Sequence, residues 1–368
     1  VLSPINVPAN DNSAMDGFAF NGKELDAAQD PVNLRIAGAI YAGQTHSPSI
    51  QMGECIKVMT GAMMPPNCDT VIPQEFTKSS EEGSITFAKD TVRAGDNRRL
   101  CGEDLQAGKP AIQRGRILKA SDIGLAASLG IAKLEVYQRI KVAILSSGDE
   151  LCSIGVPLQP GKIYDSNRFS LHACLSKLGF EIIDCGIVRD TPDDLRQAFM
   201  QAAQKADVII SSGGVSVGEA DFTKQIMEEL GQVGFWKIAM RPGRPMAFGS
   251  LKPVSPKTAP TVFFGLPGNP VAVMVTFYQF VRNALLHLNG ALNPEIPLVS
   301  IQSAEAIRKK SGRTEFQRGI LFRDPEGRLL VKSTGSQGAG ILRSMSEADC
   351  FMILHHHQGN IAPGDWVD

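Results

Sequence analysis

Residues 141–150 read KVAILSSGDE, an apolar run that ends in a polar, glycine-containing turn. Such a run is typical of a strand that is buried on both faces of a parallel sheet. Helical and apolar strand patterns then alternate along the chain, which predicts a doubly wound α/β domain. The predicted elements are a strand over 141–146, a helix over 168–178, a strand over 181–188, a helix over 195–206, a strand over 207–211, a strand over 261–264 and a helix over 271–287.

Short β segments precede this domain. Residues 32–37, 55–59 and 71–74 are apolar runs bounded by Gly, Pro, Asn and Asp, a pattern typical of strands between turns. A short helix follows them, with Ser121 as its candidate N-cap and Gly130 as its candidate stop. We therefore expect a mainly β region and a helical segment ahead of the α/β domain.

The chain returns to strands after Asn293-Pro294. Residues 315–322 and 328–332 flank the sequence DPEG at 324–327, which is typical of a β-turn and predicts a small β domain. The run His355-His356-His357 follows a further apolar strand. Adjacent strand residues point to opposite faces, so these histidines cannot all face one metal ion, and we predict a surface turn.

Composition narrows the class of protein. The chain has 368 residues, which favours several domains, and its 37 basic and 38 acidic residues argue against a nucleic-acid partner. Seven cysteines without a CxxC spacing indicate neither a disulfide framework nor a structural zinc site. No apolar run reaches the ~20 residues of a membrane span, and no signal peptide is visible. We expect a cytoplasmic protein without a membrane partner, and the lack of an initial Met suggests that the natural start is missing.

Three predicted strands lead into polar loops that contain glycine. In a doubly wound sheet the carboxyl ends of the strands face a common crevice, where ligands bind. Glycine lets the backbone approach a ligand closely and direct N–H groups at an anion. A single loop of this kind is often only a tight turn, but three together favour a ligand crevice. The loops are SSGDE at 146–150, SSGGVSVGEAD at 211–221 and GLPGNP at 265–270.

Carboxylates gather at the same loops. Such carboxylates beside an anion-binding loop suggest Mg²⁺ that bridges to phosphate, because Mg²⁺ prefers oxygen ligands. Helix capping is the alternative for Asp165 and Asp190. The chain has neither a G-x-G-x-x-G after a strand nor a P-loop, which disfavours dinucleotide folds and P-loop NTPases. The carboxylates are Asp149, Glu150, Asp165, Asp190, Glu219 and Asp221.

Positive charge is concentrated in the sequence WKIAMRPGRP at 236–245. Arg241 and Arg244 flank a rigid Pro-Gly turn, so both guanidinium groups can face one oxyanion. Lys237 lies just before them. A solvated surface turn is the alternative.

Taken together, these segments resemble the molybdopterin molybdenumtransferase family, which includes MoeA and the gephyrin E domain. The matches occur in family order and cover nearly the whole chain. They are DNSAMDG at 11–17, MTGA at 59–62, GED at 102–104, SGDE at 147–150, GGVSVGEAD at 213–221, RPGRP at 241–245, GLPGNP at 265–270 and FQRG at 316–319.

The resemblance implies an α/β multidomain homodimer whose central domain is similar to MogA, the adenylyltransferase that makes its substrate. It also implies insertion of molybdate into adenylylated molybdopterin, with Mg²⁺-dependent release of AMP, and that adenylyltransferase as a pathway partner. Four parts are expected. They are a linking domain of residues 1–7 and 106–138, a mainly β domain over 8–105, the MogA-like domain over 139–293 and a β-barrel-like domain over 294–368.

The resemblance also assigns roles to individual residues. The residues at catalytic positions are Asp16, Asp104, Glu150, Asp190, Asp221 and Lys237, of which Glu150, Asp190 and Asp221 are expected to hold Mg²⁺. The residues expected to bind substrate are Ser147, Gly213, Gly214, Ser216, Gly218, Arg241, Arg244, Pro267, Gly268, Asn269 and Arg318.

The chain departs from the family pattern at several positions. The family often has Lys where Arg241 and Arg244 stand, which keeps the charge and changes the geometry. Ala339 stands where the family commonly has Ser, so a hydroxyl contact to molybdate is not expected there. The leading segment of roughly forty residues that the family carries is absent, which fits truncation, disorder or trimming.

Two other functions are compatible with parts of the sequence. Nucleotide-processing hydrolases of the CinA type contain a related central domain, but they lack the motifs at 11–17 and 316–319. A non-enzymatic scaffold is the second alternative, because the gephyrin E domain also binds receptor tails. No tail-binding signature is visible here, and the acidic and basic site residues favour an enzyme.

Overall fold

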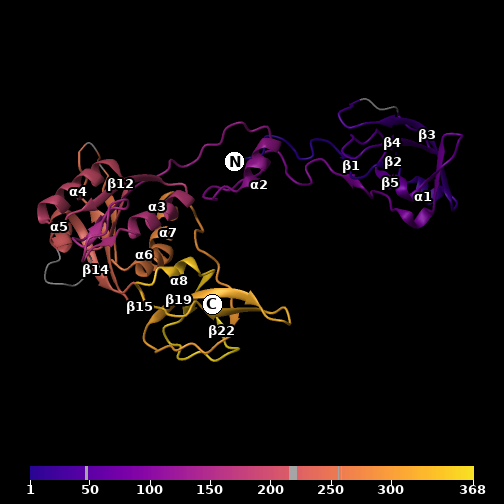
Figure 1. Ribbon diagram of the computed structural model, residues 1–368. Helices are drawn as coiled ribbons and strands as arrows, with labels where there is room; N and C mark the ends of the chain where they lie inside the picture. Colours follow the sequence, from indigo (N-terminus) through magenta and orange to yellow (C-terminus); the bar gives the residue numbers. More distant parts are fainter. Residues whose placement is uncertain (46–48, 215–221, 256, 258) are drawn as a thin grey trace. The chain divides into compact units, whose positions relative to one another are not determined.

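The computed structural model describes residues 1–45, 49–214, 222–255, 257 and 259–368 (Figure 1). Contacts divide the chain into two compact units, Val1–Glu135 and Val136–Asp368. Each unit has its own apolar cores, so each is described separately.

The first unit is built on a six-stranded sheet, which confirms the β prediction for this region. The buried side chains of Phe20, Leu34, Ile56 and Ile85 form much of its core. Its strands, in sheet order, are β5 (Thr70–Pro73), β2 (Gly17–Phe20), β4 (Glu54–Val58), β3 (Val32–Ile40), β7 (Ser84–Phe87) and β6 (Lys78–Ser79). Smaller elements are β1 (Asn12–Ser13), paired with β8 (Arg98–Arg99), the helix α1 (Glu24–Ala27) and the 3₁₀ turns η1 (Gln74–Phe76) and η2 (Lys89–Thr91).

Helix α2 (Ala120–Ser128) follows this sheet along the chain and corrects one prediction. Ser121 lies inside the helix and does not cap it. Instead, the Asp122 carboxylate accepts a hydrogen bond from the Lys119 backbone N–H at 2.8 Å, as in half of a capping box. Gly130, with φ of 71°, provides the left-handed residue that ends the helix, as predicted.

The second unit contains a six-stranded sheet whose first four strands are parallel, as predicted. The other two strands, β16 and β14, are antiparallel and were not predicted, because glycine interrupts both sequences. The strands, in sheet order, are β12 (Glu181–Val188), β9 (Lys141–Ser147), β13 (Val208–Ser212), β17 (Thr261–Leu266), β16 (Pro245–Leu251) and β14 (Gly231–Lys237).

Helices cover both faces of this sheet (Figure 1). Val142 and Ile144 pack towards α3, α6 and α7, whereas Ala143 and Leu145 pack towards α4 and α5. This alternation follows from the two-residue period of a strand, and each fully buried aliphatic side chain contributes roughly 1.5–3 kcal/mol. The helices are α3 (Asn167–Lys177), α4 (Pro192–Lys205), α5 (Phe222–Leu230), α6 (Pro270–Thr276) and α7 (Arg282–Leu288).

A π-helical turn, η3 (Phe277–Val281), joins α6 to α7 in one helical run over Pro270–Leu288. This run of 19 residues is long and apolar enough to cross a membrane, by length and composition only, although polar residues such as Gln279 and Arg282 interrupt it. Val273 and Phe277 pack in the sheet core, however, and half of the apolar window is buried inside the protein. Core packing therefore accounts for the apolar character of the run.

The last part of the chain forms a second, curved sheet, with the turn at Asp324–Gly327 between two strands as predicted. One of its strands, β15, comes from the α/β half of the unit and pairs in parallel with β19. The histidine run lies in a turn after β21, and His355 Nε2 lies 2.7 Å from Asp368 Oδ2. The elements are β15 (Met240–Arg241), β18 (Ile301–Ser303), β19 (Thr314–Arg323), β20 (Leu329–Ser333), α8 (Arg343–Ser346), β21 (Cys350–Leu354) and β22 (Trp366–Val367).

Candidate active site

A cleft of about 770 Å³ lies at the carboxyl ends of the parallel strands in the second unit. Loops of the α/β half form most of its wall, and the C-terminal part adds Arg313, Gln337 and Ala339. The predicted residues that line it are Ser147, Glu150, Asp190, Gly213, Gly214, Arg241, Arg244, Pro267, Gly268 and Asn269.

A second cavity in the same unit is larger, at about 960 Å³. It lies between the helical run that includes Tyr278 and the C-terminal sheet that includes Phe351, and its lining is mainly apolar. None of the predicted site residues within the described ranges lines it. We therefore assign the chemistry to the smaller cleft, where glycine loops, acids and guanidinium groups converge.

Close packing explains the glycines in the 211–214 loop. Gly213 has φ of 90°, and a Cβ atom at this position would lie 2.3 Å from the carbonyl oxygen of Ser147. Gly214 has φ of 66°, and its Cβ atom would lie 2.4 Å from Thr223 Oγ1. Only glycine lets the loop after β13 lie directly against the loop after β9.

Asn167, the first residue of α3, ties two of the loops together. Its side-chain amide donates to Ser212 Oγ at 2.8 Å and to the carbonyl oxygen of Gly268 at 2.7 Å. The amide nitrogen thereby uses both of its protons to hold the ends of β13 and of the Gly265–Pro270 loop. Asn167 was not predicted as a site residue, because nothing in its local sequence distinguishes it from a helix cap.

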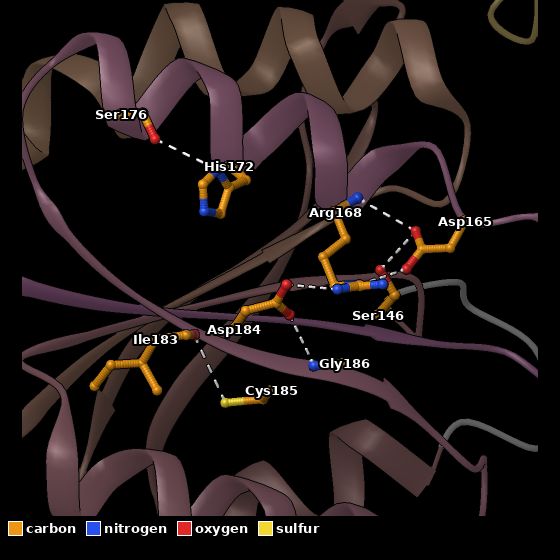
Figure 2. Close-up of polar contacts among 9 residues, drawn as sticks. All are labelled: Ser146, Asp165, Arg168, His172, Ser176, Ile183, Asp184, Cys185 and Gly186. Carbon is orange, nitrogen blue, oxygen red and sulfur yellow. Dashed lines mark hydrogen bonds and ion pairs between the residues drawn. The ribbon is translucent and has the colours of Figure 1, made fainter. Parts of the chain in front are cut away.

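Asp165 does not line the cleft. It has a structural role instead, and Figure 2 shows its contacts with Ser146 and Arg168. Its carboxylate is buried and accepts hydrogen bonds from Ser146 Oγ at 3.0 Å and from Arg168 Nε at 3.0 Å. It also accepts a hydrogen bond from the Arg168 backbone N–H at 3.2 Å. The Arg168 guanidinium donates a further hydrogen bond to the Asp184 carboxylate. The capping alternative is therefore correct for Asp165.

Among the described residues, two acidic side chains line the cleft, those of Glu150 and Asp190. Burial, followed by the nearby charges of Asp149 and Glu150, raises the pKa of Asp190 above its ordinary value. Mutual repulsion of this kind is relieved when a cation lies between the carboxylates.

The described part of the chain holds no group of three acidic, histidine or cysteine side chains close enough to bind one metal ion. The third predicted Mg²⁺ ligand, Asp221, lies outside the described residues. Ser216, Gly218 and Glu219 lie outside them as well. The two described carboxylates still fit Mg²⁺, because this ion commonly takes one or two carboxylates and completes its shell with water and phosphate oxygens.

Guanidinium groups also contribute to the lining of the cleft. Arg241 ends β15 and Arg244 directly precedes β16, and both line the cleft as expected. The Arg241 side chain is 63% exposed, and its Nη1 lies 3.9 Å from Glu315 Oε1. Arg313 also lines the cleft and was missed, because it precedes a strand in a loop without a recognisable motif.

Lys237 and Arg318 do not line the cleft. Lys237 is exposed at the end of β14. Arg318 is 1% exposed, and its guanidinium donates to Ser344 Oγ at 3.0 Å and to the carbonyl oxygen of Gly338 at 3.3 Å. Burial and then the charge of Arg241 lower the pKa of Arg318.

The C-terminal part also shapes the cleft through its backbone. The Gln337 side chain makes two hydrogen bonds with the backbone of Arg318. Its Oε1 accepts the Arg318 N–H at 2.8 Å, and its Nε2 donates to the Arg318 carbonyl oxygen at 3.2 Å. The Ala339 carbonyl accepts the Val271 N–H at 3.1 Å, which joins this segment to α6. The Ala339 side chain offers the cleft no hydroxyl.

Asp16 and Asp104 belong to the first unit. Asp16 accepts hydrogen bonds from the backbone N–H and the hydroxyl of Thr60, both at 2.7 Å, and these bonds lower its pKa. Asp104 is exposed, and its backbone N–H donates to the Val7 carbonyl at 3.0 Å.

Comparison with known proteins agrees with this fold and site. Residues 143–287, which include most of the cleft, match the family model described as a probable molybdopterin binding domain. The α/β half is thus of the molybdopterin-binding class. Residues 1–130 match the model of the MoeA N-terminal region (domain I and II), and residues 300–368 match that of the MoeA C-terminal region (domain IV).

Similar proteins extend the match to the full chain. The chain is 42% identical to molybdopterin molybdenumtransferase of Haemophilus influenzae, over 100% of this chain and 88% of that protein. It is 36% identical to the protein of the same name from Nostoc sp., over 96% and 81%. The crystal structure of the molybdopterin biosynthesis MoeA protein from Pyrococcus horikoshii OT3 matches with a TM-score of 0.81 and 26% identity, over 100% and 89%.

The chain therefore belongs to the molybdopterin molybdenumtransferase family, a family of transferases in molybdenum cofactor biosynthesis. Matches on both sides of the central domain favour this family over the hydrolase alternative.

Proposed function

We propose that this protein inserts molybdate into adenylylated molybdopterin with Mg²⁺-dependent release of AMP. One observation carries the proposal. A single cleft combines glycine loops that can hold phosphates, two acidic side chains that fit Mg²⁺, and guanidinium groups that can bind oxyanions. The names of the family relatives specify the pterin and the metal.

The residues divide this task by their chemistry. Backbone N–H groups around Gly213 and Gly268 would bind the phosphates, while Glu150 and Asp190 would hold Mg²⁺ against them. When bound, Mg²⁺ would neutralise phosphate charge. Arg241 and Arg244 would donate to phosphate or molybdate oxygens. Preorganised donors of this kind are each worth ~3 kcal/mol of transition-state stabilisation.

Several further features are part of the proposal. We propose a homodimer in the cytoplasm, with a molybdopterin adenylyltransferase as the enzyme that supplies its substrate. The four-part division of the chain into residues 1–7 with 106–138, 8–105, 139–293 and 294–368 belongs to the same proposal. The family models, which describe domains I and II over residues 1–130 and domain IV over residues 300–368, support the four-part division. The dimer, the cytoplasmic location and the supplying enzyme are proposed from the family resemblance alone.

The decisive experiment is an assay with purified protein, adenylylated molybdopterin, Mg²⁺ and molybdate, in which AMP and mature cofactor are quantified. Glu150→Gln should slow AMP release by about 10²-fold, which corresponds to ~3 kcal/mol. Glu228→Gln, on the exposed surface of α5, serves as the matched control and should behave like the wild type. Partner binding without AMP release by the wild type would support the scaffold alternative instead.

A further inference from the structure

The loop that carries Arg313 is fixed by a buried lysine. Lys309 is 5% exposed, and its ammonium donates to the carbonyl oxygens of Lys310 at 3.2 Å, Arg313 at 2.8 Å and Gln358 at 3.2 Å. An ammonium has three protons, so all of them are used to hold this loop. The Gly312 N–H adds a bond to the His356 carbonyl at 2.9 Å. The backbone at Arg313 is therefore well anchored.

The β15–β19 pair then sets the position of Arg313 relative to the cleft. The Thr314 N–H donates to the Ala239 carbonyl at 3.0 Å, and Arg241 lies opposite Glu315 in the register. Arg313 directly precedes the first residue of β19 and lies in the lining of the cleft together with Arg241. The Arg241–Glu315 contact at 3.9 Å places the start of β19 beside the arginine turn.

The Arg313 guanidinium makes no hydrogen bond to another residue in the part of the chain that the structure describes. Among the described residues, no carboxylate forms an ion pair with its guanidinium, and the residue is exposed and lines the cleft. An exposed arginine is usually a solvated surface charge. This one differs because its backbone is fixed and because two more guanidinium groups, those of Arg241 and Arg244, line the same cleft.

We propose that Arg313 is a further substrate-binding residue, whose guanidinium donates to a tetrahedral oxyanion in the cleft. The oxyanion is either the phosphate of the nucleotide or molybdate, because both offer oxygens that match the planar fork of arginine. Arg313 brings a third guanidinium to the cleft from the C-terminal part of the chain. The inference rests on the proposed function, and it adds a residue that the sequence did not identify.

Calorimetric titration of the full-length protein tests the proposal with two separate probes, AMP and molybdate. Arg313→Ala should weaken binding of at least one probe by about tenfold, which is typical for loss of a charged hydrogen bond. Arg313→Lys should recover part of that loss, because it keeps the charge without the fork. Arg308→Ala removes an exposed arginine of the same region that does not line the cleft, and it should bind both probes like the wild type.

The outcomes separate the possible ligands and the two proposals. Loss for AMP alone identifies the phosphate, loss for molybdate alone identifies the metal oxyanion, and loss for both identifies a shared position. If Arg313→Ala binds both probes as tightly as Arg308→Ala does, the inference about Arg313 is wrong. If the wild type binds the probes but releases no AMP from adenylylated molybdopterin, the proposed function fails while the binding role of Arg313 stands.

Discussion

The side-chain nitrogen of Asn167 lies 2.7 Å from the carbonyl oxygen of Gly268, and this bond joins helix α3 to a cleft loop. Because the same nitrogen also donates to Ser212 Oγ, one amide supports the loops after two different strands. The positions of the loop backbones in the cleft thus depend on a side chain that does not line it.

Asn167→Ala should reduce the free energy of unfolding by about 1–3 kcal/mol, because the Gly268 carbonyl and the Ser212 hydroxyl lose their partner. It should also raise the KM for the adenylylated pterin. Urea denaturation and steady-state kinetics measure the two effects. Asn293→Ala, at an exposed position, is the control. An unchanged KM together with the expected destabilisation would show that the loops keep their positions without this bond.

Asp165→Ala should be strongly destabilising, by about 3 kcal/mol, because it removes a buried partner of Arg168 and the acceptor of Ser146. The Mg²⁺ concentration that gives half-maximal activity should stay unchanged, since Asp165 does not line the cleft. Chemical denaturation and an Mg²⁺ titration test the two parts. A shifted Mg²⁺ requirement in a stably folded variant would contradict the structural role.

Asp190→Asn should abolish most Mg²⁺-dependent activity and yet leave the protein at least as stable as the wild type in Mg²⁺-free buffer. The folded state raises the pKa of Asp190, so it binds the proton more tightly than the unfolded chain does. The wild type therefore loses stability as the pH rises through the interval between the ordinary and the raised pKa. The advantage of the variant should be largest above the raised pKa, shrink as the pH falls through that interval, and disappear below the ordinary pKa.

Thermal unfolding of both proteins at several pH values, with and without Mg²⁺, tests this prediction. Mg²⁺ should raise the Tm of the wild type more than that of the variant, because it binds only the intact folded site. An equal Mg²⁺-induced shift in the two proteins would exclude Asp190 as a ligand.

Ser344→Ala should destabilise the protein by about 2 kcal/mol, because Ser344 Oγ accepts from the buried Arg318 Nε and donates to the Ile341 carbonyl at 2.6 Å. Ser346→Ala changes an exposed serine of the same helix, α8, and should shift stability by less than about 0.5 kcal/mol. Urea unfolding compares the two. Equal stabilities would mean that the hydroxyl of Ser344 does not support Arg318.

Cys55 and Cys68 should react very slowly with iodoacetamide, whereas Cys101 should react first. Burial raises the pKa of each of the first two thiols to about 12, so neither forms the reactive thiolate near neutral pH. Cys101 is exposed. Mass spectrometry of the labelled native protein identifies the order, and the denatured chain provides the control in which all cysteines react. Early labelling of Cys55 or Cys68 would indicate that this core opens readily.

Much of the fold could be predicted from local patterns. The continuous apolar run at 142–145 and the alternation after it predicted the parallel sheet, because burial on both faces requires such sequences. Strands β14 and β16 could not be predicted in this way. Gly231, Gly234 and Gly249 lower the local preference for strands, and pairing with β17 overrides it.

The site residues in loops that follow parallel strands could be predicted from the sequence. Those that come from segments distant in the sequence could not. Ser147, Gly213 and Gly268 were expected together, because parallel strands end at one edge of the sheet. Arg313 directly precedes β19, a strand of a different sheet that pairs with β15. No local sequence pattern predicts this pairing. Lys237 is positively charged and lies close in sequence to the RPGRP motif at 241–245. It is the last residue of β14, however, and does not line the cleft.

The β15–β19 pair also determines how the chain would respond to proteolysis. Residues 295–299, which connect the α/β half to the C-terminal sheet, are exposed and belong to no helix or strand. A single cut there would break the covalent link but leave the strand pair and the Val271–Ala339 hydrogen bond in place. The two fragments should therefore co-elute as a nicked complex, and separately expressed halves could complement each other in the cell.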